Sequence, residues 1–105
     1  MSIEIATSWK GTHSIIHVKG KFIYSTAHND FKFAYESPKF VEATSRTLDL
    51  DGVNFIDSSG LAMLLEMRSF LGGDNANISI SGLNTQTSRI LNVAGFNRLF
   101  DLKES

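Results

Sequence analysis

The sequence contains no cysteine, a single proline and no long apolar run. Without cysteine, neither disulfide bonds nor thiolate metal sites can form. No segment is apolar over the length that a membrane-spanning helix needs, and the N-terminus lacks the charged stretch and apolar run of a signal peptide. Ten basic and eleven acidic residues leave a net charge of −1, so there is no basic surplus for nucleic acid and no acidic tail for a basic partner. These absences favour a cytoplasmic protein with no membrane insertion and no nucleic-acid partner.

The chain does contain enough apolar material for one folded domain. Its 105 residues are 42% hydrophobic and include eight phenylalanines, a composition typical of a globular protein. A chain of this length can bury one hydrophobic core but not two. No internal repeat, low-complexity tract or linker divides it. We therefore expect residues 1–105 to form a single domain.

The first part of the chain has the pattern of a β-hairpin. Residues 3–7 alternate between apolar and polar side chains, and residues 14–22 do so from Ile16 onward. The turn residues Lys10-Gly11-Thr12 lie between these two stretches. We therefore expect two antiparallel strands joined by a turn.

A helix pattern follows the hairpin. Phe31 and Tyr35 share one face at helical spacing, and Tyr24-Ser25-Thr26 offers side-chain oxygens that can cap the start of the helix. Pro38 disfavours helical geometry in the residue before it, so this helix should end before the proline. We also expect a short helical turn within residues 39–45.

The second half of the chain alternates between strand and helix patterns. Strand patterns cover residues 46–50 and 78–82. One helix pattern runs from Ser58 to Leu71, and another is capped by Asn84 and closed by Gly95. This alternation indicates parallel β/α units with right-handed crossovers. The predicted fold is therefore α/β, with a small mixed sheet of four or five strands and helices packed mainly on one face.

The residues Asp57-Ser58-Ser59-Gly60 stand where a strand pattern meets the start of a helix. Any of the first three can cap that helix, because a short side-chain oxygen accepts a hydrogen bond from a free N–H of the first turn. Gly60 lets the backbone come close to whatever approaches it. An isolated segment of this kind is usually a helix cap without further function, so its neighbours have to decide its role.

Those neighbours carry a family resemblance. The segment from Leu48 to Leu61, LDLDGVNFIDSSGL, resembles the signature of STAS domains of the anti-sigma factor antagonist (anti-anti-sigma factor) type. A second segment, from Arg89 to Phe100, is similar to the last helix and closing segment of that family. The second half of the chain matches the family more closely than the first. The resemblance implies a STAS-type fold over the single domain.

The resemblance also implies a function and a modification site. In this family the hydroxyl residue directly after the aspartate is phosphorylated, which corresponds to Ser58, with Ser59 as the alternative. The protein would then be a bacterial phosphoprotein that regulates transcription by partner switching. Unphosphorylated, it would bind a serine kinase-type anti-sigma factor or an equivalent kinase. Phosphorylation would release it, a PP2C-type phosphatase would reset it, and the free protein would be a monomer.

One position departs from the family pattern, and a second interpretation of the chain also stays open. The family usually carries an aspartate where Gly20-Lys21-Phe22-Ile23 has Ile23. If that aspartate normally contacts the kinase, the partner of this protein either docks differently or is not a standard sigma-factor kinase. Other STAS domains are constitutive subunits of larger complexes, such as ABC-type lipid transporters, and are not phosphorylated. Those often carry Thr-Ala after the aspartate, so Ser58-Ser59 argues modestly against that role.

The helix after Ser58 is apolar over more of its surface than one contact with a sheet needs. A neighbouring helix can cover the surplus, as is usual for broad apolar faces. Alternatively, the methionines form an adaptable docking surface beside the phosphorylated serine. The residues expected to contact the partner are Asp57, Ser59, Gly60, Leu61, Met63 and Met67.

Catalytic and metal sites find little support in the sequence. A serine hydrolase elbow requires glycine two residues before the nucleophile, and Ile56 occupies that place relative to Ser58. The three histidines, at positions 13, 17 and 28, are more typical of surface or strand residues than of a triad base, and their spacing matches no metal-binding pattern. A phosphate-binding loop motif is also missing. We therefore expect no enzyme, no cofactor and no metal.

Overall fold

A computed structural model describes residues 3–104, and its chain begins with a β-hairpin. Strand β1 (Ile3–Lys10) pairs antiparallel with β2 (His13–Phe22), and Ile5 lies opposite Val18. Gly11 makes the turn with φ of +60°, a left-handed conformation that glycine adopts without steric cost. The predicted hairpin is confirmed. β1 runs three residues further than the alternation indicates, because Ser8, Trp9 and Lys10 continue the ladder with β2.

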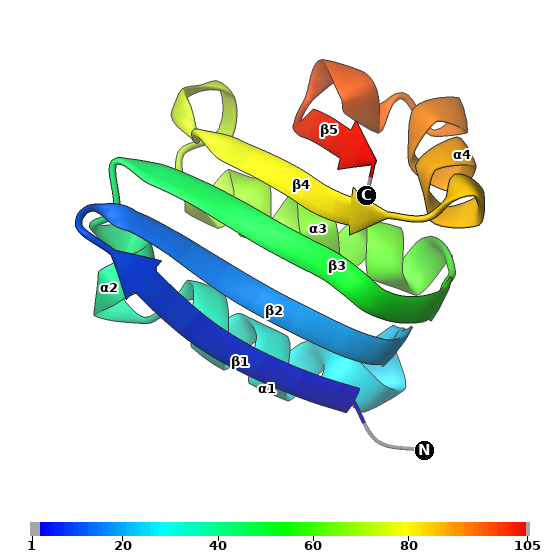
Figure 1. Ribbon diagram of the computed structural model, residues 1–105, viewed down its shortest axis with the longest axis horizontal. Coiled ribbons are helices and arrows are strands. Elements are labelled where there is room, and N and C mark those ends of the chain that lie inside the picture. Colours follow the sequence, from blue (N-terminus) through cyan, green and yellow to red (C-terminus); the bar gives the residue numbers. More distant parts are fainter. Residues whose placement is uncertain (1–2, 105) are drawn as a thin grey trace.

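Three further strands complete a mixed sheet. β3 (Ser45–Ile56), β4 (Ile78–Leu83) and β5 (Asp101–Glu104) are all parallel to β2, and the strand order is β1-β2-β3-β4-β5 (Figure 1). The predicted strand over residues 46–50 continues to Ile56. The β2–β3 register shifts between His17 and Lys19 and again between Gly20 and Lys21, which keeps both strands paired beyond Gly52.

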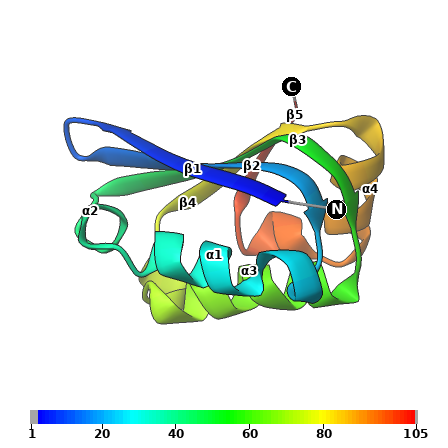
Figure 2. The same cartoon turned by 90° about the horizontal axis from the view of Figure 1, so that it is seen from below.

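The helices connect the parallel strands and lie on one side of the sheet (Figure 2). They are α1 (Tyr24–Tyr35), α2 (Pro38–Val41), α3 (Ser58–Phe70) and α4 (Thr85–Val93), with short 3₁₀ turns η1 (Gly73–Asn75) and η2 (Phe96–Arg98). α2 begins at Pro38 itself, where proline's fixed φ suits the first helical position and its missing N–H is not needed. The predicted α/β fold, a small mixed sheet with helices mainly on one face, is confirmed.

The hydrophobic core lies between the sheet and these helices. The sheet contributes fully buried side chains such as Ile16, Leu48 and Ile80. Phe22, at the end of β2, meets Phe31 of α1 edge to face, with ring centroids 5.0 Å apart. Burying one aliphatic or aromatic side chain of this size contributes roughly 1.5–3 kcal/mol. This packing holds the end of β2 against α1.

Candidate functional site

The β3–α3 junction is held by the side chain of Asp57, the N-cap residue of α3. Its Oδ1 accepts hydrogen bonds from the backbone N–H of Ser59 (2.9 Å), from that of Gly60 (3.1 Å) and from the Ser59 hydroxyl (2.6 Å). These bonds hold the pKa of the Asp57 carboxyl below its usual value, because they stabilise the charged form. The bond from the Ser59 hydroxyl lowers the pKa most, and the bond from the Gly60 amide comes second. Asp57 is therefore a charged cap that shapes the first turn.

Ser58 and Ser59 have different surroundings, although they are neighbours in sequence. Ser58 is the first residue of α3 and is exposed, and its hydroxyl has no hydrogen-bond partner among residues 3–104. The Ser59 hydroxyl is half-buried, donates to Asp57 and accepts a hydrogen bond from the backbone N–H of Tyr24 (2.9 Å). Of the two, only Ser58 offers a free hydroxyl to a modifying enzyme.

Ser59 links the starts of two helices. β2 and β3 are parallel neighbours, so the helices that follow them, α1 and α3, begin at the same edge of the sheet. Ile23 is the N-cap residue of α1 and makes no side-chain cap. The N–H of Tyr24 is instead satisfied by Ser59. Ile23 therefore places an uncharged, apolar side chain beside the Asp57–Ser59 junction.

Gly60 serves close packing at this junction. It is buried, and a Cβ at this position would collide with the backbone carbonyl of Phe22 and the side chain of Ile56. Glycine therefore lets the first turn of α3 lie directly against the ends of β2 and β3. This position explains the glycine of the sequence motif without any contact to a partner.

Partly exposed apolar side chains lie near Ser58 along the chain or at the same edge of the sheet. Leu61 is half-buried and Leu65 is 42% exposed, and both follow Ser58 at helical spacing along α3. Tyr24 is 54% exposed and Phe55, just before Asp57, is 45% exposed. Sequence reasoning did not identify Tyr24 and Phe55, because whether an aromatic side chain at the end of an element is exposed depends on the packing around it. We name Tyr24, Phe55, Leu61 and Leu65, with Ser58, the junction surface.

The prediction that Met63 and Met67 contact a partner is wrong. Both side chains lie in the core, 1% and 0% exposed. α3 turns this face toward the sheet, and α1 packs beside it, with Phe70 of α3 near Tyr35 of α1 at a ring distance of 5.7 Å. The alternative interpretation, that neighbouring elements cover the surplus apolar surface, is correct for these residues.

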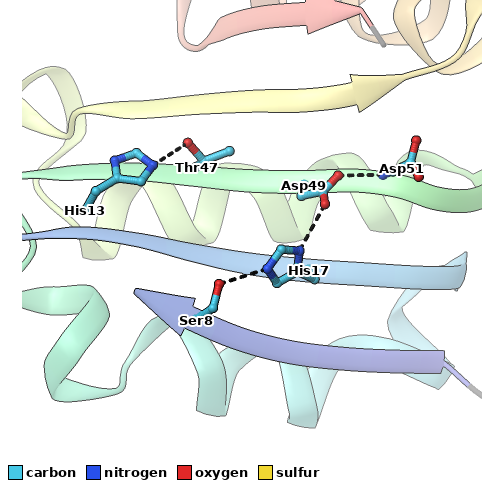
Figure 3. Close-up of polar contacts among 6 residues, drawn as sticks. All are labelled: Ser8, His13, His17, Thr47, Asp49 and Asp51. Atoms are coloured by element: carbon cyan, nitrogen blue, oxygen red, sulfur yellow. Dashed lines mark hydrogen bonds and ion pairs between the residues drawn. The ribbon is translucent and has the colours of Figure 1, made fainter. Parts of the chain in front are cut away.

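A second polar cluster lies on the face of the sheet that carries no helices (Figure 3). The Ser8 hydroxyl is 3.0 Å from His17 Nε2, and His17 Nδ1 is 3.0 Å from Asp49 Oδ2. The other oxygen of Asp49 accepts the backbone N–H of Asp51 at 3.0 Å. Sequence analysis correctly placed His17 on a strand but could not bring it to Ser8 and Asp49, because that requires the register of three strands.

Ser8, His17 and Asp49 form the hydroxyl–imidazole–carboxylate chain of a hydrolase triad, but their surroundings differ from those of a hydrolase active site. Ser8 lies within a regular strand, in the β1–β2 ladder. Hydrolases hold the nucleophile in a strained turn that aims backbone N–H groups at the developing oxyanion, and a regular strand does not provide this. His13 makes similar contacts nearby, to Ser45 at 2.6 Å and Thr47 at 2.9 Å. We therefore interpret both histidines as cross-strand links that stabilise the sheet.

Two further observations concern ligands and membranes. Among residues 3–104, no three histidine or acidic side chains come close enough together to hold a metal ion. Over the same part of the chain, each helix is too short or too polar to cross a membrane.

Comparison with known proteins gives the same picture of the fold. Structures of an anti-sigma factor antagonist from Mycobacterium paratuberculosis and of a candidate anti-sigma factor antagonist from Thermotoga maritima superimpose with TM-scores of 0.84 and 0.80. Their sequences are 22% and 16% identical, over 99% and 96% of this chain and 87% and 86% of theirs. At this level of identity the likeness shows a shared fold.

Sequence comparison adds the family. A family model described as Mlab, STAS domain, matches residues 5–102. A STAS-domain-containing protein of Pseudomonas aeruginosa is 36% identical over 104 residues, an alignment that covers 97% of this chain and 99% of the relative. Because the match extends over nearly the whole chain, the protein belongs to the STAS domain family.

Proposed function

We propose that the protein is an anti-sigma factor antagonist that works by partner switching, with Ser58 as the phosphorylated residue. The observation that carries this proposal is the contrast between the two serines. Ser58 is exposed with a free hydroxyl, whereas Ser59 is held between Asp57 and Tyr24. A kinase can reach Ser58 without breaking any hydrogen bond. The likeness to structures of anti-sigma factor antagonists supports the proposal at the level of the fold.

The partner of the unphosphorylated form would be a serine kinase-type anti-sigma factor, or an equivalent kinase, docked on the junction surface. Half-exposed aromatic and aliphatic side chains around a central polar residue are typical of the middle of a protein interface. Phosphorylation would add roughly −1.5 to −2 charges at the centre of that surface, beside the carboxylate of Asp57. A docked partner would have to desolvate both groups, so it would be released. A PP2C-type phosphatase would restore binding, and the whole cycle would take place in the cytoplasm.

Mutation of the two serines tests the proposal. Phosphorylation of the protein purified from its native cells is measured by mass spectrometry for wild type, Ser58→Ala and Ser59→Ala. We expect phosphate on wild type and on Ser59→Ala, and none on Ser58→Ala. In pull-downs, Ser58→Ala should retain the kinase partner at least as well as wild type, and Ser58→Asp should retain less, because one negative charge mimics phosphate in part. Equal binding by all variants would refute the switch.

A constitutive role is the second candidate, in which the chain is a permanent STAS subunit of a larger complex such as an ABC-type lipid transporter. Ile23 favours it, because the acidic residue of the switching proteins is missing beside the junction. Under this alternative, the protein would carry no phosphate in native cells. The same pull-down would then recover transporter subunits with wild type, Ser58→Ala and Ser58→Asp alike.

A further inference from the structure

The two edges of the sheet differ in how well they are protected. β5 is four residues long and charged at Asp101, Lys103 and Glu104, which discourages pairing with another strand. β1, the outermost strand on the other side (Figure 1), is eight residues long, has no proline and pairs with β2 without a bulge. A regular edge of this length exposes unpaired N–H and C=O groups to any strand that fits. We propose that β1 pairs antiparallel with β1 of a second copy, which joins two five-stranded sheets into one.

The sequence of β1 is self-complementary about Thr7. In an antiparallel pair, residues directly opposite each other point to the same face. A two-fold axis at Thr7 places Glu4 opposite Lys10 of the second copy, both on the open face, where they form a pair of opposite charges. The same axis places Ile5 opposite Trp9 of the second copy, both on the helix face. Because the arrangement is symmetric, each of these contacts forms twice.

Exposed aromatic side chains beside β1 fit this register. Phe33 of α1 is 82% exposed and lies at a hollow of about 390 Å³ that Ile5, Thr7 and Ala34 also line. Trp9 points to the helix face but is still 55% exposed. The ammonium group of Lys39 lies over its ring, 4.8 Å from the ring centroid. In the dimer, Trp9 of one copy lies beside Ile5 of the other and therefore over this hollow, next to Phe33. The same contact between the two copies thus covers Trp9 of one copy and Phe33 of the other.

This arrangement departs from the monomer that the sequence suggested, and it does not depend on Ser58 or its phosphorylation. Nearly neutral net charge permits self-association, since two copies at a net charge of −1 repel each other weakly. The polar link from Ser8 to His17 ties β1 to its neighbour and keeps the edge regular. The dimer would therefore form by docking of two preformed edges.

Charge reversal tests the register. Sedimentation velocity over a wide range of concentrations should show the wild type shifting from the mass of one chain to that of two. Glu4→Lys and Lys10→Glu should each weaken dimerisation roughly tenfold, because two attractive pairs become repulsive. The double variant Glu4→Lys/Lys10→Glu should restore it. A wild type that remains monomeric at every concentration, or single variants that dimerise like the wild type, would overturn the proposal.

A cysteine at the axis provides a second test, which the absence of native cysteine makes clean. Thr7→Cys should give a disulfide-linked dimer under mild oxidation, because residues opposite each other across a strand pair lie within disulfide reach. Lys103→Cys, on the opposite edge strand, is the matched control and should stay monomeric on the gel. Cross-linking of Lys103→Cys but not of Thr7→Cys would overturn the proposal in favour of a different interface. Ser58→Asp should dimerise like the wild type, so this result is independent of the proposed switch.

Discussion

At Asp57, one carboxylate oxygen accepts three hydrogen bonds from the residues that follow it. A negative charge at this place also meets the positive end of the α3 dipole. The side chain therefore has two tasks, as hydrogen-bond acceptor and as charge. Ser59 is a hydrogen-bond acceptor as well: its hydroxyl accepts from the backbone N–H of Tyr24 at the start of α1 while it donates to Asp57.

The depressed pKa of Asp57 predicts a pH-dependent contribution to folding. A carboxyl whose folded pKa lies below its unfolded value of 3.8 stabilises the fold above that value, and the stabilisation is lost as the pH falls through the lower folded pKa. Asp57→Asn keeps a capping acceptor but carries no charge. We expect urea denaturation to show wild type more stable than Asp57→Asn at neutral pH, with the difference shrinking in acid. A difference that is independent of pH would contradict this account.

Gly60 predicts an unusual response to alanine. In an exposed helix position, replacing glycine by alanine is favourable by about 1 kcal/mol. At Gly60 the added methyl group would meet the carbonyl of Phe22 and the side chain of Ile56, so overpacking should dominate and destabilise the protein by about 1–3 kcal/mol. Thermal denaturation of Gly60→Ala measures the effect. As a control, Ala62→Gly in the exposed part of α3 should lose about 1 kcal/mol from helix propensity alone.

At the scale of elements, α3 shows which features a sequence pattern can and cannot predict. The start at Ser58 and the end before Gly72 follow from local residue types, and the structure confirms both. The sequence left the cap open among Asp57, Ser58 and Ser59, and the structure assigns it to Asp57. Apolar periodicity shows that α3 has a wide apolar face, but it does not show which part of that face another element covers. Met67 and Leu65 are both apolar and two residues apart, yet one is buried and the other is 42% exposed. That difference depends on α1, which is distant in sequence.

Alanine substitutions on the two faces of α3 measure this division. Met67→Ala should lower the free energy of unfolding by about 2–5 kcal/mol, because it leaves a cavity in the core. Leu65→Ala should cost no more than about 0.5–1 kcal/mol and should instead weaken partner binding. Urea denaturation should show the larger loss of stability for Met67→Ala, and pull-down should show the larger loss of partner binding for Leu65→Ala. If Met67→Ala folded as stably as Leu65→Ala, the assignment of the core face would be wrong.

At the scale of the whole molecule, the contacts on one face of the sheet can be predicted from the sequence pattern, and those on the other face cannot. The helix-covered face carries the apolar alternation from which the fold class was predicted. The open face carries polar residues whose partners depend on register, so the link from Ser8 through His17 to Asp49 could not be predicted from spacing. The junction surface could be predicted in part. Ser58 follows from the motif, whereas Tyr24 joins the surface only because parallel strands bring two helix starts together.

The hydrogen bonds at the start of α3 determine where a phosphate on Ser58 would lie. A phosphate at the start of a helix can accept hydrogen bonds from free backbone N–H groups. In the structure, the N–H groups of Ser59 and Gly60 already donate to Asp57. A phosphate on Ser58 would therefore extend into solvent beside a carboxylate and would add its charge to the surface. It would break none of the hydrogen bonds that hold the first turn.

Phosphorylation should therefore leave the fold intact while it abolishes binding. We expect the phosphorylated protein to melt within a few degrees of the unmodified one, and the amides of residues 59–65 to exchange hydrogen at nearly the same rate in both forms. Partner binding should nevertheless fall sharply, because the charge would lie on the junction surface, beside the carboxylate of Asp57. Ser59→Ala is the control for a loosened helix start, since it removes the bonds to Asp57 and Tyr24 and should speed exchange at the same amides. If phosphorylation speeds exchange as much as Ser59→Ala does, release occurs by melting of the helix start rather than by charge at the interface.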